Sequence, residues 1–141
     1  MDTAIALALF ARTTVLFRVK GRAAVARVSR ESMRGRATTR AELEASGVDV
    51  WRGVRAIWRA KRLWPSRTMC LETALVAHWF FGRKGIHAPL HLGVQKADET
   101  LKAHAWVRIG DYEVDLSGVY PEYLPFAGEG RGVALEGDVT A

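Results

Sequence analysis

The sequence is poor in cysteine and proline and has no long apolar run. Of its 141 residues, one is cysteine and four are proline. A lone cysteine cannot form an internal disulfide, so nothing requires an oxidising compartment. The most apolar stretch, residues 1–17, falls short of the ~20 residues that span a bilayer and contains Asp2 and Arg12. We therefore expect a cytoplasmic protein, with this helix either packed in the core or lying on the inner face of the membrane.

Signatures of nucleotide and metal binding are also missing. The sequence contains no Walker motif and no dinucleotide-binding glycine motif. His87 and His91 are four residues apart, but Pro89 between them excludes a helical pair of ligands, and one cysteine gives no zinc-binding spacing. We expect neither a cofactor nor a metal.

Charge of opposite sign dominates the two halves of the chain. Residues 1–69 hold 15 basic and 5 acidic side chains, whereas residues 70–141 hold 6 and 10. A basic half indicates either solvated helix faces or a surface for an anionic partner. One functional hypothesis is therefore a basic, non-catalytic binding module for nucleic acid or a membrane surface.

Residues 1–49 are expected to form a basic, helical N-terminal region. Apolar residues recur at helical spacing over residues 4–19. Residues 20–36 form either a second basic helix or a link. Thr39 and Glu42 fit a capping box, which predicts another short helix.

Two longer helices open the segment 50–120, which we expect to be the core of a single domain. Asp49 is a suitable N-cap for the first helix. Its apolar side consists of Val50, Trp51, Val54, Ile57 and Trp58, which we assign to the core. The second helix, over residues 68–84, is apolar around most of its circumference and is predicted to be central and buried. Cys70 lies in its first turn.

A small antiparallel sheet should follow the helices. Residues 90–95 alternate between apolar and polar, as do residues 103–109, with a polar loop expected over 97–102. Gly110-Asp111 suits a two-residue turn before a return strand, and residues 121–141 are expected to form an irregular tail. The fold class is therefore α+β, with the Cys70 helix packed on a small antiparallel sheet.

The predicted turn places three reactive side chains within reach of one another. If Ile109 pairs with Tyr112, one face of the hairpin carries His104, Trp106, Arg108, Glu113, Asp115 and Ser117. Asp115 is then a diagonal neighbour of His104, and Arg108 neutralises Glu113. Asp115 is left as the free carboxylate nearest the imidazole.

These positions suit a cysteine nucleophile. A thiol in the first turn of a helix is favoured as thiolate by the helix dipole and by unpaired backbone N–H groups. His104 can hold that thiolate and protonate a leaving amine, and Asp115 can fix the imidazole tautomer. The Cys70 backbone N–H is a natural oxyanion donor, and candidates for a second donor are Trp64, Ser66 and Thr68. The structural alternative is a small buried cysteine and a structural histidine.

Motifs over residues 50–118 resemble the stand-alone, transglutaminase-like leader peptidases of lasso peptide biosynthesis. They are Cys70-Leu71-Glu72-x-Ala74-Leu75, Arg83-Lys84-Gly85-Ile86, Leu92-Gly93-Val94, Ala103-His104-Ala105-Trp106-Val107 and Val114-Asp115. The basic residue that the family often carries near Thr73 is absent here.

The resemblance implies a papain/transglutaminase-like core with Cys70, His104 and Asp115 as a catalytic triad. It also implies a substrate and partners. The substrate would be a ribosomally made precursor, cut between leader and core. The partners would be a separate small leader-recognition protein in trans and a macrolactam synthetase, with no nucleic acid expected.

Overall fold

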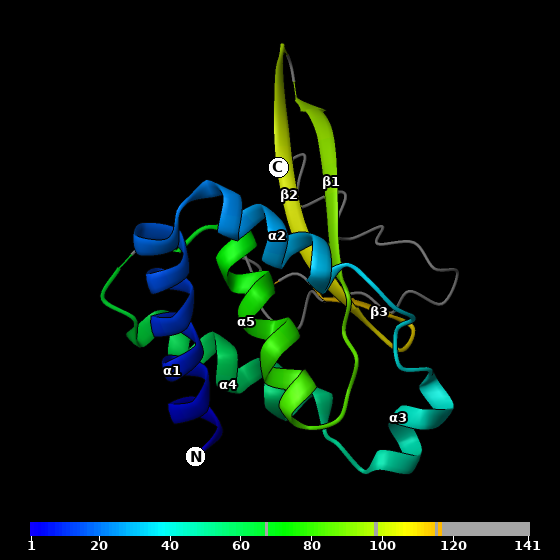
Figure 1. The fold of residues 1–141 in the computed structure, drawn as a ribbon. Coiled ribbons are helices and arrows are strands. Elements are labelled where there is room, and N and C mark those ends of the chain that lie inside the picture. The colour runs from blue at the N-terminus through cyan, green and yellow to red at the C-terminus, as the bar shows by residue number, and fades with distance from the viewer. Residues whose placement is uncertain (67, 98, 115, 117–141) are drawn as a thin grey trace.

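The protein is a mixed helical and antiparallel structure in which the sheet follows the helices along the chain. The computed structural model describes residues 1–66, 68–97, 99–114 and 116. The elements are α1 Asp2–Val15, a π-helical turn Leu16–Lys20, α2 Arg22–Ser32, α3 Arg40–Ser46, α4 Val50–Leu63, α5 Cys70–Arg83, β1 Leu90–Ala97, β2 Thr100–Ile109 and β3 Tyr112–Val114. Helix α5 lies between α1 and the sheet, and the β1–β2 ribbon extends beyond the helices (Figure 1). The predicted α+β fold class is confirmed.

Helix boundaries follow the capping residues. The Thr39 hydroxyl accepts from the Glu42 backbone N–H, and Asp49 accepts from the Arg52 N–H at 3.1 Å. Helix α5 ends in a Schellman motif, in which Gly85 has φ +80° and the Ile86 N–H donates to the Phe81 carbonyl at 2.9 Å. The Schellman motif fixes where α5 ends and the chain turns toward β1.

The core is built jointly by α1, α4, α5 and the inner face of the sheet. Its largest fully buried side chains include Phe10, Ile57, Phe80 and Phe81. The helix predicted near the N-terminus is therefore a packed core helix. Of the residues predicted for the core side of α4, Val50 and Trp51 are half-buried and pack against the core. Trp58 is also half-buried, but the Arg62 guanidinium lies over its ring, 4.7 Å from the centroid. No helix among the described residues combines the length and apolarity needed to cross a bilayer.

Gly53 allows α4 to approach α5 closely. A Cβ at this position would lie 2.8 Å from two carbons of the Phe81 ring and 3.0 Å from Phe80. Alanine gains up to about 1 kcal/mol over glycine in a helix, but overpacking a core costs about 1–3 kcal/mol. We expect Gly53→Ala to lower the free energy of unfolding by about 1 kcal/mol, as measured by urea denaturation.

Gly82 provides the matched control for this prediction. It is exposed in α5, and a Cβ added there would have no neighbouring atom within 4 Å. Gly82→Ala should therefore raise the free energy of unfolding by about 0.5–1 kcal/mol. Equal effects of the two substitutions would contradict the proposed close approach.

The sheet has the order β1-β2-β3 with antiparallel neighbours. Ile109 pairs with Tyr112 and Arg108 with Glu113, which confirms the predicted hairpin register. The prediction of a loop over residues 97–102 is wrong, because β1 continues to Ala97 and β2 begins at Thr100. The two strands extend past the core here as a ribbon. Strand residues outside the core can be polar, so the polar sequence did not indicate a loop. The predicted tail, residues 121–141, lies outside the described residues.

A connector over residues 33–39 ties the N-terminal helices to the sheet. The Thr38 N–H donates to the His87 carbonyl at 3.0 Å, and the His87 N–H donates to the Thr38 hydroxyl at 2.7 Å. The Gly110 N–H donates to the Thr38 carbonyl at 3.0 Å. These bonds hold the hairpin turn against the helical part of the molecule.

Candidate active site

Cys70 is the first residue of α5. The residue before it, Met69, has an extended backbone conformation, and its N–H donates to the Glu72 carboxylate at 3.2 Å. Helix α5 buries seven of its residues: Thr73, Ala74, Leu75, Val76, Ala77, Phe80 and Phe81. The prediction of a buried central helix is confirmed, and the thiol is held at the start of a rigid element.

The structure brings Cys70 and His104 together. The thiol is half-buried, and its hydrogen bond with the His104 side chain lowers the pKa of Cys70 below its ordinary value. Burial acts in the opposite direction, while the backbone N–H groups of Ala105 and Leu71 and the charge of His104 add to the lowering. The start of α5 lowers the pKa of Cys70 as predicted, and strand β2 lowers it further through the Ala105 N–H and His104. Together these groups favour the thiolate.

His104 lies on the half-buried side of β2. Along this strand Ala105, Val107 and Ile109 are buried, whereas His104, Trp106 and Arg108 alternate with them and are only partly covered. His104 pairs across the ribbon with Gly93 of β1. Asp115 lies outside the described residues, so its place beside His104 stays a prediction.

A buried carboxylate organises the face on which His104 lies. Glu113 is 4% exposed and accepts hydrogen bonds from the Trp106 indole N–H and from Arg108 Nε, the latter at 2.9 Å. The Trp106 ring is nearly parallel to that of His104 at 26°, with ring centroids 6.0 Å apart. The prediction that Arg108 neutralises Glu113 is confirmed.

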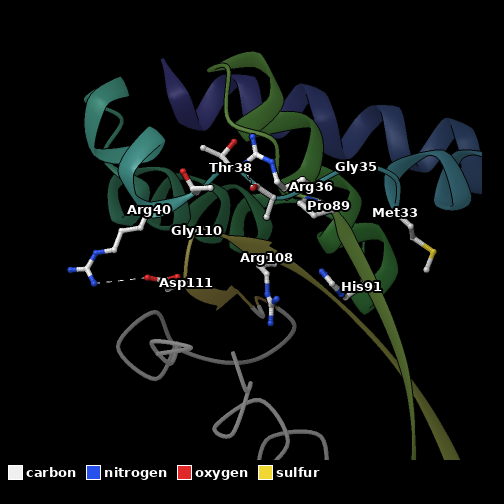
Figure 2. Close-up of a pocket in the computed structure, with 12 residues that line it drawn as sticks. Met33, Gly35, Arg36, Thr38, Arg40, Pro89, His91, Arg108, Gly110 and Asp111 are labelled. Carbon is white, nitrogen blue, oxygen red and sulfur yellow. Dashed lines mark hydrogen bonds and ion pairs between the residues drawn. The ribbon is translucent and has the colours of Figure 1, made fainter. Parts of the chain in front are cut away.

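A cavity of about 380 Å³ borders the face of the sheet that carries His104, Trp106 and Arg108. It lies between the connector and the sheet and is lined by Thr38 and Pro89 on one side and by His91 and Arg108 from the strands (Figure 2). Burial lowers the pKa of His91, which favours the neutral imidazole. Arg40 and Asp111 face each other across one edge of the cavity, 3.9 Å apart (Figure 2).

The family of the chain follows from comparison with known proteins. A model of the transglutaminase-like superfamily matches residues 5–124. The chain belongs to the transglutaminase-like superfamily. No curated protein and no solved structure shows a significant match. The superfamily comprises cysteine peptidases and transglutaminases, and the thiol–imidazole pair described here has the chemistry that both require.

Two other histidines of this transglutaminase-like chain, His78 and His87, bond to backbone carbonyl oxygens. His78 is half-buried, its Nδ1 lies 2.7 Å from the Ala88 carbonyl oxygen, and burial lowers its pKa. His87 Nε2 lies 2.7 Å from the Arg34 carbonyl oxygen. Within the described part of the chain, no group of three or more His, Cys, Asp or Glu residues could hold a metal ion.

Sequence reasoning found the thiol and the imidazole but missed two features of their surroundings. The Ala105 N–H at the sulfur depends on how α5 meets β2, which no sequence pattern specifies. The contact of Trp106 with His104 could have been found from the sequence, because the predicted register already placed both residues on one face.

Trp64 was one of three candidates for a second oxyanion donor. In the structure its ring is stacked on that of Phe10, with centroids 6.3 Å apart.

Proposed function

We propose that this chain is a cysteine peptidase that removes the leader peptide from the precursor of a ribosomally synthesised lasso peptide. The observation that carries the enzymatic part is the hydrogen-bonded pair of Cys70, at the start of α5, and His104, on β2. The substrate class rests on the resemblance of the motifs around Cys70, Gly85 and His104 to leader peptidases of this pathway.

The proposed reaction proceeds through a thioester. The Cys70 thiolate attacks the carbonyl carbon of the leader–core peptide bond, and the carbonyl oxygen becomes an oxyanion near backbone N–H groups. His104 donates its proton to the leaving amine, which frees the N-terminus of the core peptide. His104 then takes a proton from water, which attacks the thioester and releases the leader acid and the thiolate. Asp115 would orient the imidazole during both steps.

The test is a cleavage assay with defined components. The purified chain is mixed with a lasso precursor and the matching leader-recognition protein, and the products are identified by mass spectrometry. We expect two peptides whose masses add up to the precursor plus one water. Uncut precursor, or transfer of the leader to an added amine in place of hydrolysis, would contradict the peptidase assignment. A thiol alkylator should block cleavage, and a metal chelator should not.

We propose that the basic helix α2 docks the leader-recognition protein, or else the membrane-bound maturation machinery. Arg22, Arg27 and Arg30 on this helix are exposed, so they are available to an acidic partner surface. Deleting the N-terminal helices would not test docking, because α1 contributes Phe10 to the core and its loss would disturb the fold.

Charge reversal at Arg22, Arg27 and Arg30 tests the docking surface without disturbing the core. We expect KM for precursor presented by the recognition protein to rise roughly tenfold, because electrostatic steering is lost. The rate of Cys70 alkylation should not change. An unaltered KM would remove the docking role, and DNA affinity that falls steeply with salt would favour the binding-module alternative.

A further inference from the structure

Trp106 is the side chain whose ring lies alongside the His104 imidazole on the half-buried face of β2. The two rings are 26° from parallel, with centroids 6.0 Å apart. An imidazolium at this distance from an indole face is within the range of a cation–π interaction. The protonated form of His104, which pairs with a thiolate, is therefore the form that this neighbour favours.

The position of the Trp106 ring is fixed from two sides. Its indole N–H donates to Glu113, a carboxylate that is 4% exposed and is neutralised by Arg108. The far edge of the indole lies over Gly93, where a Cβ would be 2.9 Å from Cη2 and 3.1 Å from Cζ3. Gly93 is also the cross-strand partner of His104. A tryptophan held by a buried ion pair and seated over a glycine has little freedom to move.

We propose that Trp106, anchored by Glu113 and Arg108, is a positioning residue that holds the His104 imidazolium against the Cys70 thiolate. The proposal deepens the proposed function, since it takes Cys70 and His104 as the reactive pair. Trp106 acts through His104 and does not itself exchange a proton.

Charged and titratable groups on α5, β2 and their neighbouring elements make contacts of their own. They include Glu72 on α5, Lys61 on α4, His91 on β1, Arg108 on β2 and Glu113 on β3. Glu72 accepts from the Met69 N–H, and Lys61 donates to the Leu116 carbonyl at 3.0 Å. The His91 ring lies nearly parallel to Trp106, with centroids 6.0 Å apart, and burial lowers its pKa.

Replacing Trp106 should change the pKa of Cys70, and the sign of that change depends on whether the His104 hydrogen bond or burial affects the thiol more. The His104 hydrogen bond lowers the pKa of Cys70 more than burial raises it. Loosening the imidazole weakens this hydrogen bond, which is the larger of the two influences, so the pKa of the thiol should rise even though added water would relieve part of the burial. Below that pKa less thiolate is present, so alkylation of Cys70 should become slower.

The experiment measures the rate of Cys70 alkylation by iodoacetamide as a function of pH. Cys70 is the only cysteine in the chain, so the signal has one source. The variants are Trp106→Ala and Trp106→Phe. We expect a higher apparent pKa and, below it, a rate about two- to five-fold lower in Trp106→Ala. Trp106→Phe, which keeps an aromatic face without the indole N–H, should fall between it and the unmodified protein.

Trp58→Phe serves as the matched control, because Trp58 lies beside Arg62 on α4. Its alkylation profile should equal that of the unmodified protein. If Trp106→Ala does not fold, Trp106→Phe decides the question. Unchanged profiles in the folded Trp106 variants, or the same shift in Trp58→Phe, would overturn the proposal. Alkylation needs no peptide substrate, so this outcome is independent of whether the chain cleaves a leader.

Discussion

Cys70→Ser is expected to lower the turnover of leader cleavage by on the order of 10³-fold or more. Serine is nearly isosteric, so the fold should persist, but its hydroxyl stays protonated at neutral pH. The His104 hydrogen bond that lowers the pKa of the Cys70 thiol cannot then produce an anionic nucleophile at the start of α5. The measurement is the initial rate of precursor cleavage followed by mass spectrometry.

Met69→Leu is the control for Cys70→Ser. Met69 is the neighbouring residue, and it is 66% exposed. Its replacement alters a side chain at the same helix end without touching the thiol, so turnover should be retained. Retention of more than about a tenth of the activity by Cys70→Ser would contradict a cysteine nucleophile.

His104→Gln is expected to reduce turnover by a comparable factor at acidic pH, and by less as the pH rises. The His104 hydrogen bond is the largest influence that lowers the pKa of Cys70. Without it, the thiolate forms only near the ordinary thiol pKa, so the loss is greatest below that value. Above it the thiolate is present again, and only the missing proton donor limits the rate. Rates measured across this range give the predicted slope.

His78→Gln is the matched histidine control. His78 lies on the same helix as Cys70, but its ring bonds to the Ala88 carbonyl. The shape of its pH profile should match that of the unmodified protein. A loss in His104→Gln that is uniform across pH would show that His104 does not set the ionisation of the thiol.

Local signals were sufficient to predict much of the fold. Thr39, Asp49 and Gly85 end or begin helices because each satisfies backbone groups within a few residues of itself. The hairpin register followed from one glycine turn and period-two alternation. The length of the β1–β2 ribbon was missed because alternation is not required of strands that extend beyond the core.

The candidate site was only partly predictable, since its geometry depends on long-range packing. The position of Cys70 at a helix start and of His104 on a strand could be inferred from local patterns. That the Ala105 N–H reaches the sulfur depends on the docking of α5 against β2. The burial of Glu113 likewise depends on neighbours that the sequence does not identify. Membership of the transglutaminase-like superfamily agrees with the predicted fold but leaves the substrate to experiment.

The most direct test of this account is an ultraviolet titration of the thiolate, with Cys70→Ala as the blank. One cysteine is present, so the difference signal belongs to Cys70 alone. We expect a midpoint clearly below that of an ordinary cysteine, and a higher midpoint in His104→Gln. A midpoint at or above the ordinary value, unmoved by His104→Gln, would contradict the thiolate–imidazolium pair and with it the proposed peptidase.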